Sequence, residues 1–97
     1  MRHFGSTISV ELTERLIEKG MPELLETYAE VFDWFIRNGI YVTVVPERIS
    51  LPGGGYEYRY RPFVDYKFGR WPKKTDWHSA ADAAIEKALK LINSQKP

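Results

Sequence analysis

Between residues 56 and 68, hydrophobic and charged side chains alternate almost one by one. The even positions carry hydrophobic residues, namely Tyr56, Tyr58, Tyr60, Pro62, Val64, Tyr66 and Phe68. Most odd positions carry charges, namely Glu57, Arg59, Arg61, Asp65 and Lys67. Because side chains of a strand point to alternate faces, this pattern predicts a half-buried strand, or two strands bent at Pro62. We expect the even face to belong to the core and the odd face to meet water.

The segments before this strand read as another strand and a turn. Residues 40–46, IYVTVVP, are short and β-branched, and Pro46 either ends the strand or marks an edge of the sheet. Glycines 53–55 are followed by a strand rather than by a helix, so they do not fit a phosphate-binding loop. We expect them to form a hairpin turn, because glycine readily adopts the positive φ that such turns need.

Three segments have helical spacing and end signals. The first runs over residues 9–20, with Ser9 as N-cap and Gly20 as its end. The second begins at Pro22 and ends at Asn38-Gly39. The third, DWHSAADAAIEKALKLIN, is capped by Thr75 or Asp76.

The buried faces of the second and third helices follow from the same spacing. The second has a hydrophobic stripe of Leu25, Tyr28, Ala29, Phe32, Phe35 and Ile36. The stripe of the third is Trp77, Ala81, Ala84, Ile85, Ala88 and Ile92, with Asp82, Glu86 and Lys90 toward water. The alanines allow a helix to approach the aromatic strand closely. We therefore predict a two-layer α+β fold in which an antiparallel sheet packs on the helices. Its order is two helices, a first strand, then either one long strand or two shorter ones, and a last helix.

Length and composition predict one domain over residues 1–97, with flexible ends at 1–8 and 94–97. The chain has no cysteine, which excludes disulfides and thiolate metal sites. It also shows no apolar run of signal-peptide or membrane-spanning length. We expect a soluble, intracellular protein with no membrane partner.

Positive charge is concentrated in the middle of the chain. The net charge is −4 over residues 1–47, +5 over 48–74 and 0 over 75–97. The basic block holds Arg59, Arg61, Lys67, Arg70, Lys73 and Lys74 with Trp71 among them, a mixture that suits phosphate contacts and base stacking. Glu57 and Asp65 interrupt it, however, and a sheet covered on one side must show charges on the other. Binding of an anionic partner and a merely solvated sheet face both remain open.

Three large aromatic residues lie outside the predicted core: Trp34, Trp71 and Tyr41. Trp34 falls opposite the stripe of its helix, beside Glu23, Thr27 and Glu30. Exposed aromatics next to arginines are typical anchors of protein interfaces. The alternative for Trp34 is a helix that packs at another rotation, or cover from the first helix. Self-association through these aromatics is also open.

The chain offers little for catalysis. His78 and Asp82 are four residues apart on one helix, but one imidazole and one carboxylate are too few ligands for a specific metal site. A local hydrogen bond at the start of the helix is the simpler interpretation. No activated serine or cysteine pattern is present. We expect a protein that is not an enzyme and has no cofactor and no metal.

Most of residues 14–92 resembles a large group of uncharacterised small proteins from phages, prophages and mobile elements of Bacteroidetes. The similarity lies in LIEKG, in YAEVFDWFIRNGIYVTVVP with the glycine-rich turn and aromatic strand after it, and in TDWHSAADAAIEKALKLI. Its matching positions are Trp34, Phe35, Gly39, Ile40, Trp77, Ala81, Ala84, Ile85, Ala88, Leu89, Leu91 and Ile92. These are mainly packing positions, so the resemblance implies a phage-type accessory protein in the cytoplasm of a bacterial host and no particular activity.

The order of elements is also similar to that of double-stranded RNA-binding domains, with Lys73-Lys74 before an alanine-rich helix. The chain departs from that domain in its extra first helix and in the loop after the first strand, where the expected histidine is missing. Together these patterns predict a non-enzymatic accessory protein that binds a host macromolecule, such as a host protein, or a small anionic molecule, with a role against host defence as a hypothesis. The alternative is a nucleic-acid-binding module that uses the basic segment 59–74.

Overall fold

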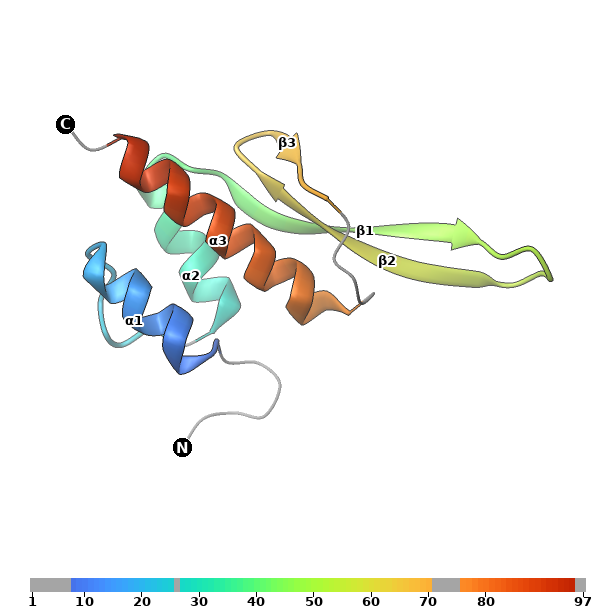
Figure 1. Ribbon diagram of the computed structural model, residues 1–97, viewed down its shortest axis with the longest axis horizontal. Helices are drawn as coiled ribbons and strands as arrows, with labels where there is room; N and C mark the ends of the chain where they lie inside the picture. The colour runs from blue at the N-terminus through green and yellow to red at the C-terminus, as the bar shows by residue number, and fades with distance from the viewer. Residues whose placement is uncertain (1–7, 26, 71–75, 96–97) are drawn as a thin grey trace.

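The fold is a three-stranded antiparallel sheet with helices on one face. The computed structural model describes residues 8–25, 27–70 and 76–95. In chain order the elements are α1 (Val10–Glu18), α2 (Tyr28–Arg37), β1 (Val42–Ser50), β2 (Tyr56–Val64), β3 (Lys67–Phe68) and α3 (Trp77–Gln95). The sheet order is β1-β2-β3, and β1 and β2 both contact α3. Figure 1 shows the helices grouped together and the β1–β2 hairpin projecting beyond them. The predicted α+β class is confirmed.

Side-chain caps fix the starts of the first and last helices. The Ser9 hydroxyl accepts the Leu12 N–H at 3.2 Å, as predicted for α1. At α3 the Asp76 carboxylate accepts the Ser79 N–H at 2.8 Å, whereas Thr75 lies outside the described residues. Each cap supplies a partner for an N–H that has none within its own helix.

The second helix begins later than the sequence indicated. It starts at Tyr28 and not at Pro22, because Thr27 and Glu30 form a capping box. The Thr27 hydroxyl accepts the Glu30 N–H at 3.2 Å, and the Glu30 carboxylate accepts the Thr27 N–H at 3.1 Å. These two reciprocal hydrogen bonds give partners to backbone N–H groups at the start of the helix, several residues after the proline. The end at Asn38, followed by Gly39, is as predicted.

The buried face of α2 is rotated relative to the predicted stripe. Val31 is fully buried, whereas Ala29 is exposed and Ile36 is 44% exposed. The reason is that α2 packs against two neighbours, β1 and α3, rather than against one flat sheet. Trp34 consequently lies half-buried against the core.

Buried alanines let α3 lie close to the sheet. Ala81, Ala84 and Ala88 are fully buried, and Ile85 between them fills the core. This confirms the predicted stripe. Ile8, which was expected in a flexible segment, is also in the core at 1% exposed.

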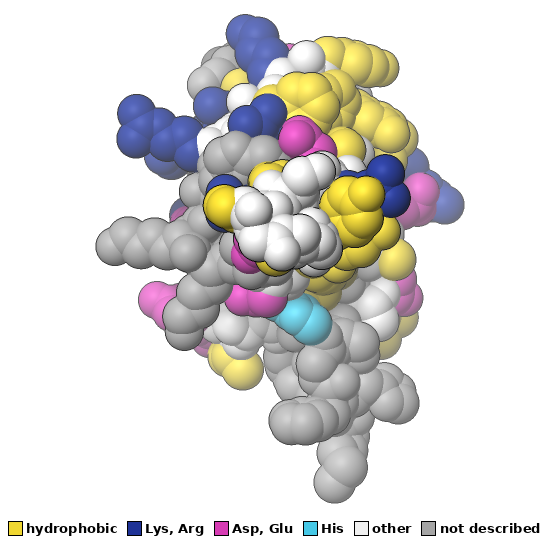
Figure 2. All heavy atoms as spheres, turned by 90° about the vertical axis from the view of Figure 1, so that its right-hand side faces the viewer, with side chains coloured by type: hydrophobic (Ala, Val, Ile, Leu, Met, Phe, Trp, Pro, Cys, Tyr) yellow, Lys and Arg dark blue, Asp and Glu magenta, His cyan; other side chains and the backbone are white. Residues whose placement is uncertain are grey.

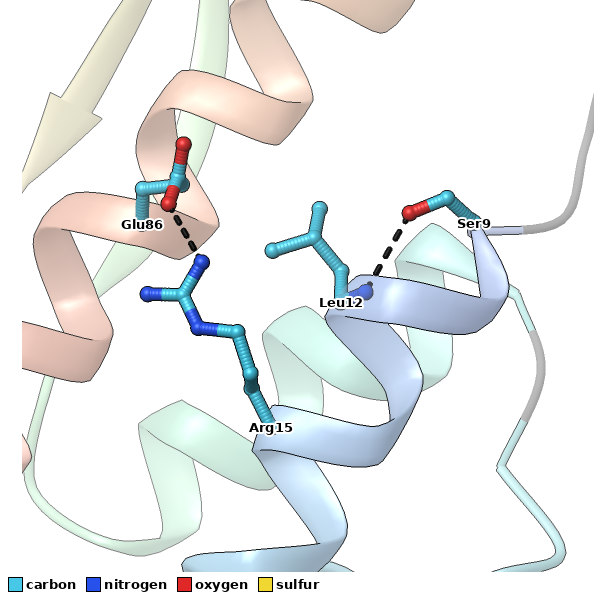
Figure 3. Close-up of polar contacts among 4 residues, drawn as sticks. All are labelled: Ser9, Leu12, Arg15 and Glu86. Atoms are coloured by element: carbon cyan, nitrogen blue, oxygen red, sulfur yellow. Dashed lines mark hydrogen bonds and ion pairs between the residues drawn. The ribbon is translucent and has the colours of Figure 1, made fainter.

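The first helix is joined to α3 by a polar contact and by hydrophobic packing. Arg15 of α1 forms an ion pair with Glu86 of α3 at 2.6 Å (Figure 3). Leu12 and Leu16 turn toward the core and are buried. Because both charged groups of the pair are about half exposed, the packing contributes more to stability than the ion pair does.

The two long strands extend well past the helices. Val42 pairs with Val64, and the register continues to Ser50 opposite Tyr56. β1 therefore passes through Pro46 instead of ending there, which is compatible with an edge strand. Gly54 and Gly55, with φ of 95° and 85°, form the turn between the strands, as predicted.

The predicted aromatic core of the hairpin is wrong for most of its length. Val64 and Pro62 are buried, but Tyr56 is 61% exposed and Tyr58 is 56% exposed. The alternation correctly separates the two faces. The helices, however, cover only the part of the sheet nearest to α3, so the tyrosines toward the turn lie beyond them (Figure 1).

The break between β2 and β3 lies at Asp65-Tyr66 and not at Pro62. Both turn residues have positive φ, 52° and 66°, as in the tight turns that suit hairpins. The turn shifts the alternation, because Phe63 now pairs with Phe68 and Val64 pairs with Lys67. Phe68 therefore leaves the predicted core face, while Lys67 moves onto the face toward α3. Tyr66, at the tip of the turn, is 75% exposed.

Candidate functional site

A small pocket lies where the β2–β3 hairpin meets α3. Its volume is about 180 Å³. It is lined by Pro62, Val64, Lys67, Gly69, Arg70, Ala83 and Lys87. Such a volume is below the roughly 300–1,000 Å³ of sites for drug-sized ligands. The pocket therefore suits a small molecule or one group of a larger one.

Two tight features of the backbone position the sheet side of this pocket. The Asp65-Tyr66 turn places Lys67 on the same face as Val64. After β3, the Gly69 N–H donates to the Pro62 carbonyl at 2.8 Å, which holds the chain against β2 just before Arg70. Lys67 and Arg70 thus come from a segment that is tied closely to β2.

The helix side of the pocket comes from Ala83 and Lys87. These residues are four apart on α3 and therefore share one face of the helix. The small Ala83 side chain leaves room beside Pro62 and Val64, and Lys87 adds a third cation next to those of the hairpin. Sequence reasoning missed both residues. The sequence feature that could have identified them is their position next to the buried stripe of α3, on the side of the helix that faces the sheet.

The charge of the pocket is positive. Lys67, Arg70 and Lys87 are all exposed, and none forms an ion pair with another described residue. No acidic residue lines the pocket within the described part of the chain. Cations without nearby carboxylates above an apolar floor attract an anion that carries a small hydrophobic group.

Arg59 and Arg61, by contrast, do not form a free basic surface. Arg59 pairs with Glu57 at 3.5 Å, and Arg61 pairs with Glu47 of the neighbouring strand at 3.7 Å. The Arg61 guanidinium also lies 5.3 Å from the centre of the Phe68 ring. The structure therefore separates these arginines from Lys67 and Arg70, with which the sequence had grouped them, and places them on the opposite face of the sheet.

That opposite face carries an aromatic cluster of Tyr41, Phe63, Tyr66 and Phe68. Tyr41 and Tyr66 are stacked with ring centres 5.5 Å apart, and Phe63 meets Phe68 edge to face at 4.8 Å. Figure 2, seen from the hairpin end, shows hydrophobic side chains gathered at the upper right and basic side chains at the upper left. Tyr41 is 39% exposed, in line with its prediction as a surface aromatic.

Of the two tryptophans predicted as interface anchors, the described structure contains Trp34. Trp34 packs edge to face on Phe35 at 5.0 Å and lines a shallow hollow with Pro22, Leu25, Glu30, Asp33 and Arg37. Its partial burial agrees with the alternative of a differently packed helix. Trp71, Lys73 and Lys74 lie outside the described residues.

Asp82 and His78 take part in packing rather than in a common ligand site. The Tyr28 hydroxyl donates to Asp82 at 2.7 Å, so Asp82 is not simply solvated as predicted. Burial, reinforced by this hydrogen bond, raises the pKa of Tyr28 well above its ordinary value. The His78 and Tyr28 rings meet edge to face at 5.6 Å. Among the described residues no cluster of three or more His, Asp or Glu side chains could hold a metal ion.

Comparison with known proteins gives no match to a protein-family model, to a curated protein or to a solved structure. The chain is therefore described by its own fold and pocket. It is a small α+β protein with a cationic pocket between sheet and helix. In the described part of the chain, no helix is long and apolar enough to cross a membrane.

Proposed function

We propose that the protein binds a small anionic molecule in the pocket formed by Lys67, Arg70 and Lys87, and that it does so without catalysing a reaction. The observation that carries this proposal is the meeting of three cations over an apolar floor, from β3, from the residues just after it and from α3, without a described carboxylate beside them. An ordinary solvated surface mixes charges of both signs, as the opposite face of this sheet does.

The shape of the pocket narrows the class of ligand. A carboxylate or phosphate would lie among the cations, where Arg70 can donate two parallel hydrogen bonds and the lysines add point charges. A small apolar group would rest on Pro62, Val64 and Ala83. A fully hydrated inorganic ion would leave this floor unused, so we expect an organic anion to bind more tightly.

A phage-type origin, which we propose from the sequence resemblance alone, is consistent with this binding activity. Such an origin implies that the protein acts inside a bacterial cytoplasm. An accessory protein with no catalytic activity can oppose host defence by sequestering an anionic signal or metabolite. We therefore propose sequestration as the way in which ligand binding serves such a protein.

The nucleic-acid alternative has less support. Arg59 and Arg61, its two central arginines, are paired with Glu57 and Glu47 on a face of mixed charge. Binding to nucleic acid would weaken steeply as salt increases and would fall after Lys73→Glu and Lys74→Glu. Tight RNA binding with that behaviour would favour the alternative.

Calorimetric titration of the whole chain tests the proposal. Phenyl phosphate and benzoate serve as probes, inorganic phosphate as the anion without an apolar group, and benzylamine as the cation. We expect Arg70→Ala and Lys87→Ala to weaken binding of phenyl phosphate about tenfold each. Lys90→Ala is the matched control, since Lys90 is on the same helix but lines a different hollow with Arg15, Glu18, Lys19 and Leu89. Equal loss in the control, or no binding of either organic anion, would overturn the proposal.

A further inference from the structure

The β1–β2 ladder shows which backbone groups point out of the sheet. At one end the Leu51 N–H donates to the Gly55 carbonyl at 3.1 Å, and at the other the Asp65 N–H donates to the Tyr41 carbonyl at 2.7 Å. Both bonds join odd-numbered residues that continue the register of the strands. Because bonded and non-bonded pairs alternate in an antiparallel ladder, the odd residues bond across it. The even residues of both strands therefore direct their N–H and C=O groups outward.

The outer edge of β1 is protected against further pairing. Pro46 is an even residue, so its ring takes the place of an outward N–H group in the middle of this edge. A proline at such a position leaves the internal ladder intact and removes a donor that another strand would need.

Over residues 56–60, the outer edge of β2 has no such protection from the described part of the chain. β3 and Gly69 pair with β2 only from Pro62 onward. Toward the hairpin turn, Tyr56, Tyr58 and Tyr60 direct their backbone groups outward, and no described strand pairs with them on that side. An unpaired strand edge of this kind is a template for another strand.

We propose that this edge binds the same edge of a second copy of the chain, antiparallel about a two-fold axis at Tyr58. Residues 56–60 read Tyr-Glu-Tyr-Arg-Tyr. In this arrangement Glu57 of each copy faces Arg59 of the other, so the interface contains two pairs of opposite charge. One continuous β-sheet would then run through both molecules, with β2 beside β2 at its centre.

Charge selects this register over its neighbours. Because the outward groups belong to even residues, an even residue of one copy must face an even residue of the other. The two-fold axis must therefore pass through a residue and not between two residues. An axis at Glu57 places two glutamates opposite each other, and an axis at Arg59 places two arginines opposite each other. Like charges directly opposite destabilise a strand pair, whereas opposite charges stabilise it. Tyr58 is therefore the favoured centre.

The side chains also suit this pairing. Glu57 and Arg59 would form non-hydrogen-bonded pairs, in which facing side chains come closest. Both lie on the face that the helices leave open, with side chains 34% and 41% exposed. On the other face, Tyr56 would pack against Tyr60 of the second copy, which covers apolar surface that the projecting hairpin now leaves to water.

A charge-swap experiment on the full chain tests this interface. Sedimentation velocity over a range of concentrations should show a monomer–dimer equilibrium. Glu57→Arg and Arg59→Glu should each raise the dimer dissociation constant about tenfold or more, because each places two like-charged pairs in the interface. An equimolar mixture of the two variants should associate again. In the mixed dimer both pairs between positions 57 and 59 join opposite charges, as they do in the wild type.

Proline variants test the contribution of backbone hydrogen bonds at the strand edge separately from that of the charged side chains. Tyr58→Pro removes an outward N–H at the centre and should abolish the dimer, whereas Arg48→Pro, at an outward position of β1, should leave it unchanged. Circular dichroism verifies that both remain folded. A wild-type chain that stays monomeric at millimolar concentration would overturn the proposal. So would folded charge variants that dimerise as before, or a mixture that fails to associate.

Discussion

Gly69 lies so close to Pro62 that a side chain would not fit between them. A Cβ atom at Gly69 would come within 2.9 Å of the Pro62 Cγ, while the Gly69 N–H bonds to the Pro62 carbonyl at 2.8 Å. The contact places Arg70 beside Lys67 at the edge of the pocket. One glycine thus couples the packing of β3 to the geometry of the proposed binding site.

Gly69→Ala should therefore destabilise the protein and weaken ligand binding. We expect a loss of about 1–3 kcal/mol in the free energy of unfolding, because the added methyl group must push the chain after β3 away from the proline ring. Urea denaturation measures the effect. Gly53→Ala is the matched control, since a Cβ there meets nothing within 4 Å and its φ is not positive. Equal stability of the Gly69 variant and the wild type would contradict this account of the contact.

The capping box of α2 makes a second prediction. Thr27→Ala removes the hydroxyl that accepts the Glu30 N–H and should cost about 1 kcal/mol of stability. Thr13→Ala, within α1, removes only a hydrogen bond to the Ser9 carbonyl and should change stability by less than about 0.5 kcal/mol. Thermal unfolding followed by circular dichroism compares them. If Thr27→Ala is neutral, the box does not determine where α2 begins.

The Tyr28–Asp82 hydrogen bond predicts a change of stability at alkaline pH. The pKa of Tyr28 is raised above its ordinary value of 10.0 in the folded protein, first by burial and then by Asp82. When pH rises above about 10, the unfolded chain therefore loses this proton before the folded one does, and stability falls. Tyr28→Phe should lack this loss, so its stability relative to the wild type should improve above about pH 10. Urea denaturation at each pH measures the free energy of unfolding, and Tyr56→Phe, at the exposed end of the hairpin, serves as the control. If the free energy of unfolding of Tyr28→Phe and of the wild type changed in parallel with pH, the prediction would be refuted.

Acid should act at the start of α3. The pKa of Asp76 is lowered, chiefly by the hydrogen bond from the Ser79 backbone N–H. The folded state thus favours the charged carboxylate, and the stability it gives is present above the ordinary pKa of 3.8 and lost as pH falls through the folded value. Asp76→Asn should flatten this acid limb of the stability curve, whereas Asp65→Asn in the exposed turn should retain it. An unchanged acid limb in Asp76→Asn would argue against the cap.

Local signals in the sequence predicted the helices well and failed where two signals competed. Ser9 was recognised, and Asp76 was named as one of two candidates with Thr75, because a short polar side chain before a hydrophobic stripe has few other roles at a helix start. The start of α2 was misplaced because Pro22 and Thr27 are both good starting residues. Only the observed pairing of Thr27 with Glu30 decides between them.

The strand pattern predicted the faces of the hairpin but not which parts of them are covered. Alternation says nothing about how far a helix extends over a sheet, so Tyr56 and Tyr58 were placed in a core that ends before them. The pocket was half predicted for the same reason. Lys67 and Arg70 were named from charge alone, whereas Lys87 joins them only through the tertiary contact of α3 with β2.

Titration of the ¹⁵N-labelled chain with phenyl phosphate, followed by amide chemical shifts, tests the central claim most directly. The account predicts saturable shifts at Val64, Lys67, Gly69, Arg70, Ala83 and Lys87, the residues with an amide N–H that line the pocket. Ala83→Leu, which fills the pocket without changing its charge, should abolish these shifts. Shifts that are absent, or that spread along the Arg59–Arg61 face and persist in Ala83→Leu, would contradict it.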